Sequence, residues 1–63
     1  MYRVINNQTG NLVDEGTSEE MKDVLLSLQS LMKYLGINTT LLKDKLVVDS
    51  SNKFEYLLMH HAD

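Results

Sequence analysis

Residues 17–36 carry the signals of one complete amphipathic helix, and this segment constrains the fold more than any other feature of the chain. Its apolar residues recur every three or four positions, which is the spacing of one helical face. The stripe consists of Met21, Leu25, Leu28, Met32 and Leu35, widened by Val24 and Leu31. Side chains at this spacing project to the same side, so the helix needs an apolar surface to pack on.

Both ends of this helix are marked by capping residues. Thr17 offers a hydroxyl to the first free backbone N–H groups, and Glu20 follows three residues later, at the spacing of a capping box. At the other end, Gly36 suits the left-handed conformation that closes many helices. The sequence therefore predicts a helix from about Ser18 to Leu35.

Short runs rich in β-forming residues flank the helix on both sides. Asn7–Asn11 is a turn-forming cluster between the first two runs, and residues 49–53 separate the last two, so each pair predicts a hairpin. Residues 37–40 are expected to connect the helix to the second hairpin, and a helical turn at Leu41–Lys45 is an alternative to a strand there. The predicted strands are Tyr2–Asn6, Leu12–Glu15, Leu41–Asp49 and Phe54–His60.

The order of these elements predicts an α+β fold. Residues 1–63 are expected to form a single ββαββ domain, with a four-stranded, mostly antiparallel sheet and the helix packed on one face. A chain of 63 residues has a thin core, and the absence of cysteine excludes disulfides and thiolate zinc sites. Unusually good packing or a partner chain must supply the remaining stability.

Apolar residues on both faces of the predicted sheet favour the partner chain. Alternation places Leu42, Leu46 and Val48 on one face of their strand, with Val47 on the other. One helix covers one face, so large side chains remain on the far side whichever face is covered. We expect a homo-oligomer, with a dimer favoured; a monomer with a wet, partly apolar face is the alternative. The candidate interface residues are Ile5, Val47, Leu57 and Met59.

The charges are unevenly placed, and this distribution bears on the type of partner. The net charge is −3, and residues 14–23 hold five carboxylates against the single base Lys22. Nucleic-acid binders show the reverse, so we expect a protein partner. The candidate partner surface comprises Glu19, Glu20, Asp23 and Leu26, although the acids also suit the positive end of the helix dipole. The alternative is a nucleic-acid-binding or transcription-related module that uses Arg3, Lys43, Lys45 and Lys53.

No residue pattern indicates catalysis or a bound cofactor. The three glycines fall at turn and cap positions, and the serines of the last predicted turn have no partner histidine. His60 and His61 are adjacent, and adjacent strand residues point to opposite faces, so one metal ion cannot readily bind both. We therefore expect no enzyme activity, no cofactor and no metal. The N-terminus lacks a long apolar region, which indicates a cytoplasmic protein without membrane association.

One stretch carries a family resemblance. Thr9-Gly10-Asn11-Leu12-Val13-Asp14-Glu15-Gly16-Thr17-Ser18-Glu19-Glu20 resembles the opening of many small open reading frames in phages and prophages of Gram-positive bacteria. In those proteins a Thr-Gly hairpin turn leads through a short strand to a Gly-Thr or Gly-Ser cap and an acidic helix start. The resemblance implies an accessory protein that binds a host or phage protein and alters its work, and no functional residue carries over from it.

Overall fold

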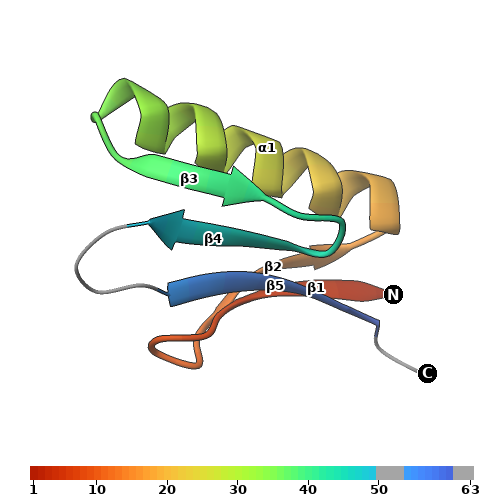
Figure 1. The fold of residues 1–63 in the computed structure, drawn as a ribbon. Helices are drawn as coiled ribbons and strands as arrows, with labels where there is room; N and C mark the ends of the chain where they lie inside the picture. The colour runs from red at the N-terminus through yellow and green to blue at the C-terminus, as the bar shows by residue number, and fades with distance from the viewer. Residues whose placement is uncertain (50–53, 61–63) are drawn as a thin grey trace.

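The computed structural model describes residues 1–49 and 54–60, which form one helix and five strands. Figure 1 shows the strands as one layer with the helix lying across it. The elements in chain order are β1 (Tyr2–Asn6), β2 (Leu12–Gly16), α1 (Ser18–Tyr34), β3 (Asn38–Leu41), β4 (Lys45–Asp49) and β5 (Phe54–His60).

The sheet is antiparallel throughout, in the order β2-β1-β5-β4-β3. The N-terminal hairpin and the C-terminal three-stranded meander meet where β1 pairs with β5. The predicted α+β class is therefore confirmed. The predicted four strands and ββαββ order are wrong, because the described chain has five strands in the order ββαβββ.

The error lies in the segment predicted as one strand, Leu41–Asp49. A tight turn interrupts it: the Leu42 N–H donates to the Lys45 carbonyl oxygen over 2.8 Å, and the chain reverses into β4. No glycine or proline marks this turn. The reversal places Leu41 opposite Leu46, so Leu41 packs against the core, whereas the prediction put Leu42 on that face. Leu42 is exposed.

The predicted helix caps are confirmed in detail. The Glu20 N–H donates to the Thr17 hydroxyl over 3.1 Å, and the Thr17 N–H donates to a Glu20 carboxylate oxygen over 3.0 Å, which is the reciprocal capping box. At the far end Gly36 has a φ of 80°, and its N–H donates to the Lys33 carbonyl oxygen. The Ile37 N–H donates to the Met32 carbonyl oxygen over 2.8 Å, which completes a Schellman motif.

The core fills the space between the helix and one face of the sheet. Its buried residues are Val4, Met21, Leu25, Met32, Leu46 and Val48. The buried stripe of the helix is narrower than predicted, since Leu31 and Leu35 are 56% and 63% exposed. Leu31 lies about 100° around the helix from Met32, and Leu35 is the C-cap, beyond the last helical residue.

Candidate functional site

The face of the sheet that points away from α1, called here the outer face, carries an apolar row across three strands. Ile5 of β1 lies opposite Leu57 of β5 on one side and opposite Leu12 of β2 on the other. The neighbours of Ile5 and Leu57 along their strands, Val4 and Leu58, belong to the core or pack against it, so Ile5 and Leu57 point outward. No described part of the chain packs over this row (Figure 1).

All four candidate interface residues lie on the outer face. Met59 is two residues beyond Leu57 on β5, and Val47 is two residues beyond Lys45, which lies opposite Leu57. Residues at such positions share one face of a sheet and lie within reach of their diagonal neighbours. The structure therefore brings Ile5, Val47, Leu57 and Met59 together. Their role as an interface stays a prediction.

Sequence reasoning missed Leu12 as a member of this surface. Leu12 is 52% exposed and pairs with Ile5, but the register of β1 and β2 skips Val13. An irregularity of this kind shifts the faces of a strand by one residue. Counting alternate residues from Gly16, at the other end of β2, therefore assigns Leu12 to the helix side of the sheet, whereas its pairing with Ile5 places it on the outer face.

Two ion pairs flank the apolar row on the outer face. The Arg3 Nε lies 3.1 Å from a Glu15 carboxylate oxygen, across β1 and β2. The Lys45 Nζ lies 3.1 Å from a Glu55 carboxylate oxygen, across β4 and β5. Exposed pairs of this kind contribute little to stability, about 0–1 kcal/mol each. They matter for the shape of the surface instead, because they place charged side chains on both sides of the apolar row. Protein interfaces have a polar rim of this kind.

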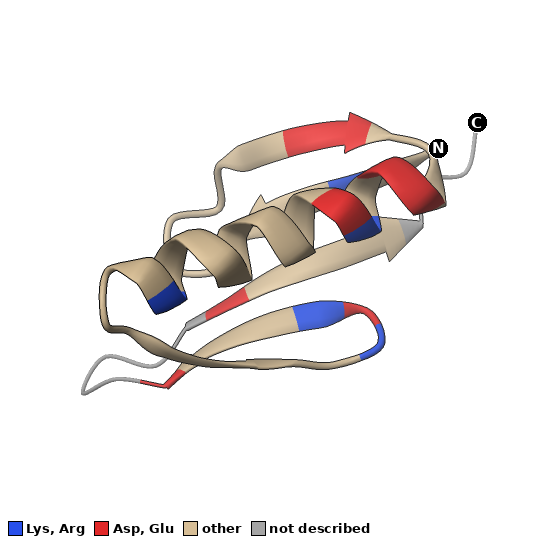
Figure 2. Ribbon diagram, turned by 90° about the horizontal axis from the view of Figure 1, so that it is seen from above, with Lys and Arg blue, Asp and Glu red and all other residues tan. Residues whose placement is uncertain are grey.

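The second predicted surface lies at the start of the helix. Glu19, Glu20, Asp23 and Leu26 are all exposed on α1. Glu20 is held by the capping box, and hydrogen bonds from the Thr17 backbone N–H and then from the Thr17 hydroxyl lower the pKa of its carboxyl group. Figure 2 shows acidic residues on β2 and at the start of α1, on the same end of the molecule. This end is therefore negatively charged at neutral pH.

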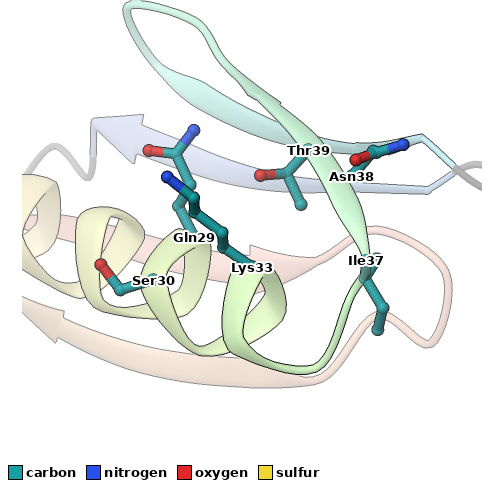
Figure 3. Close-up of a pocket in the computed structure, with 6 residues that line it drawn as sticks. All are labelled: Gln29, Ser30, Lys33, Ile37, Asn38 and Thr39. Atoms are coloured by element: carbon teal, nitrogen blue, oxygen red, sulfur yellow. The ribbon is translucent and has the colours of Figure 1, made fainter.

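Two hollows that the sequence did not predict lie between α1 and β3, one toward each end of the strand, and they are called here together the groove. At one end it is lined by Lys22, Leu25, Leu26, Leu41, Leu42 and Lys43. At the other end, a cavity of about 450 Å³ is lined by Gln29, Ser30, Lys33, Ile37, Asn38 and Thr39 (Figure 3). Figure 3 shows the side chains of Gln29 and Lys33 extending from the helix toward β3. Leu26 thus lies in this groove, whereas Lys22 and Lys43 give it a charge opposite to that of the helix start.

The basic residues of the nucleic-acid alternative do not form one patch. Arg3 and Lys45 lie on the outer face, on β1 and β4, each with a glutamate partner. Lys43 lies in the turn before β4, whereas Lys45 lies on β4 itself, because the turn interrupts the predicted strand. Lys53 and His61 lie outside the described residues.

The described residues also bear on metal binding, on membrane spanning and on similarity to known proteins. Among residues 1–49 and 54–60, no three histidine, aspartate or glutamate side chains are grouped so that they could hold a metal ion. Within the same residues, no helix has the length and apolar character needed to cross a membrane. No family model matches the chain, and no curated protein or solved structure matches it.

Proposed function

We propose that this chain is a small cytoplasmic protein-interaction module, which forms a homodimer through its outer face and acts as an accessory or inhibitor protein by binding another protein. The observation that carries the proposal is the apolar row Leu12–Ile5–Leu57 with Met59 and Val47 beside it. A small core stabilises a chain of this size only weakly, and burying large apolar side chains stabilises a protein by about 1.5–3 kcal/mol each when burial is complete.

The outer face is small for a dimer interface. Strands lie about 4.8 Å apart and rise about 3.4 Å per residue, so five strands of about five residues present roughly 400 Å². Two copies would bury roughly 800 Å² in total, below the ~1,200 Å² typical of stable complexes. Ile5, Val47 and Leu57 are already half-buried by their neighbours, which reduces the gain further. We therefore propose a weak dimer that forms at high micromolar concentration.

A dimer of this kind leaves the other surfaces available. The sheets would stack face to face, about 10 Å apart, with the helix of each copy pointing away from the contact. The acidic helix start, with Glu19, Asp23 and Leu26, would remain exposed on both copies. An acidic surface can compete for the basic groove of a nucleic-acid-binding protein, which suits an inhibitor.

Sedimentation across a range of protein concentrations tests the homodimer. Leu57→Lys places a charge at the centre of the outer face, and Leu35→Lys is the matched control, since Leu35 is 63% exposed at the end of the helix. We expect the wild type and Leu35→Lys to dimerise between micromolar and millimolar concentration, and Leu57→Lys to remain monomeric. A wild-type protein that is monomeric throughout this range would overturn the proposal.

A pull-down from host lysate and a titration with DNA and RNA at low salt test the mode of action. The proposal predicts a stoichiometric protein partner and no binding to either nucleic acid. Saturable binding to a nucleic acid without a protein partner would favour the alternative module instead.

A further inference from the structure

We propose that the groove between α1 and β3 binds an extended acidic segment of another protein, which adds to the sheet beside β3 as a further strand. This inference goes beyond the proposed function, because it gives the module a second binding surface, for an acidic segment, beside the acidic helix start. It rests on the role of the chain as a protein-binding module and does not depend on the homodimer. Three features of the described residues support it: the open edge of β3, the lysines of the groove and their spacing.

The open edge of β3 supplies the main-chain hydrogen bonds. β3 pairs with β4 alone and ends the sheet. In an antiparallel pair, hydrogen-bonded and non-hydrogen-bonded positions alternate, and the Leu42 N–H bonds to the Lys45 carbonyl oxygen. Counting back from that bond, the N–H and C=O groups of Thr39 and Leu41 point away from β4, toward the open edge. An edge of this kind is the surface to which extended peptides add.

The groove beside this edge is basic and partly apolar. Lys22, Lys33 and Lys43 line it, and no carboxylate is among its lining residues. In the described part of the chain, none of these three lysines lies within 4.0 Å of a carboxylate oxygen. Arg3 and Lys45, by contrast, each lie 3.1 Å from a glutamate carboxylate oxygen. Glu19, Asp23 and Asp44 are exposed nearby on α1 and the turn. The residues that line the groove carry three lysines and no carboxylate, which favours an acidic segment, although the exposed Asp49 of β4 lies opposite Asn38 at the Lys33 end.

The spacing of the groove residues predicts the order of side chains in the segment. The helix rises about 1.5 Å per residue, which places Leu26 about 6 Å and Lys33 about 16 Å from Lys22 along its axis. A strand turns every second side chain to the same face, about 6.8 Å apart. Residues one and three of a strand beside β3 would thus lie level with Lys22 and Leu26, and residue five would lie about 3 Å short of Lys33, a difference that the long lysine side chain spans. The preferred pattern is an acid, any residue, an apolar residue, any residue and an acid.

The leucines around Leu26 explain why the third position of this pattern should be apolar. Leu26 and Leu42 are 47% and 44% exposed and line the same end of the groove as the half-buried Leu41. An apolar side chain of the segment would cover all three. Exposure of two leucines beside an open edge is costly in water, and occupation of the groove removes both from solvent.

A synthetic peptide tests the inference directly. The probe is the acetylated and amidated peptide Thr-Glu-Thr-Leu-Thr-Glu-Thr, titrated to millimolar concentration into the ¹⁵N-labelled protein and followed by NMR. We expect saturable shifts of the amide signals of Thr39 and Leu41 and of α1 between Lys22 and Lys33. A peptide with lysine in place of glutamate, and one with methylated backbone nitrogens along the bonding edge, should each bind at least several-fold more weakly.

Matched protein variants separate the groove from the rest of the surface. Lys33→Gln and Lys43→Gln should each weaken binding about twofold to fivefold, the range expected for loss of one exposed ion pair. Lys45→Gln is the control, because Lys45 lies on the outer face. No saturable shift, shifts confined to the outer face, or equal binding of the lysine peptide would overturn the inference.

Peptide binding measured on the wild type and on Leu57→Lys separates the two proposals, because both proteins should bind the peptide whether or not they dimerise. Peptide binding by a wild-type protein that never dimerises would retain the groove and reject the homodimer. A dimer that does not bind the glutamate peptide would reject the groove and retain the homodimer.

Discussion

The capping box at the start of α1 allows a quantitative prediction. Thr17→Ala removes the hydroxyl that accepts the Glu20 N–H over 3.1 Å, while the backbone bond from the Thr17 N–H to the Glu20 carboxylate remains possible. Loss of a threonine N-cap costs about 1 kcal/mol, within a range of about 0.5–2 kcal/mol. Thr17→Ser keeps the acceptor and should retain most of the stability.

This loss is large for so small a protein. At ~0.05–0.15 kcal/mol per residue, a chain of this length is stable by roughly 3–9 kcal/mol. A loss of about 1 kcal/mol lowers the Tm of a domain of 60–100 residues by roughly 4–8 °C. Urea unfolding followed by circular dichroism should show a lower midpoint with an unchanged slope. All variants need the same low protein concentration, since dimerisation would add stability by mass action.

The pH dependence gives an independent test of the same motif. Hydrogen bonds from Thr17 lower the pKa of Glu20 below its usual value of 4.5 in the folded protein. A carboxyl group whose pKa is lower when folded stabilises the protein above its unfolded pKa, and this contribution is lost as pH falls through the folded pKa. Glu20→Gln should therefore lower the urea midpoint at pH 7. In acid, below the folded pKa of Glu20, the wild type and the variant should have similar midpoints. A serine variant as unstable as the alanine variant, or a glutamine effect that grows in acid, would refute the reasoning.

Two further substitutions test the described core. Leu46→Ala removes a fully buried side chain of β4, which should cost about 2–5 kcal/mol, a large share of the total stability, and thermal unfolding should show a much lower midpoint. Leu31→Lys should change stability by less than about 0.5 kcal/mol in urea, because Leu31 is 56% exposed. A loss of several kcal/mol for Leu31→Lys would place this residue in the core, as the helical periodicity alone had predicted.

Local signals predicted the parts of the fold that local chemistry determines. The helix and both of its caps follow from Thr17, Glu20 and Gly36, whose roles depend on residues within one turn of them. The N-terminal hairpin follows from a turn in which the Asn6 side chain accepts the Gln8 N–H over 2.9 Å. Propensity and spacing are sufficient wherever the hydrogen-bond partner is only a few residues away.

The strand and face assignments failed where tertiary pairing decides the outcome. Residues 38–40 are polar and have no apolar alternation, and their strand conformation depends on pairing with β4. The groove beside β3 and the position of Lys43 therefore could not be predicted from the sequence. The four outer-face residues could be predicted because alternation within β1, β4 and β5 is regular, whereas Leu12 was missed because of the irregular pairing at Val13.

The Schellman motif at Gly36 has a mechanical consequence. The hydrogen bond from the Ile37 N–H to the Met32 carbonyl oxygen ties the three residues between α1 and β3 back to the last turn of the helix. The two walls beside Lys33 are thus fixed by the same few backbone bonds before any ligand arrives. In the proposed binding mode the groove would lose little conformational entropy on association, so the affinity should depend on the rigidity of the ligand more than on that of the groove.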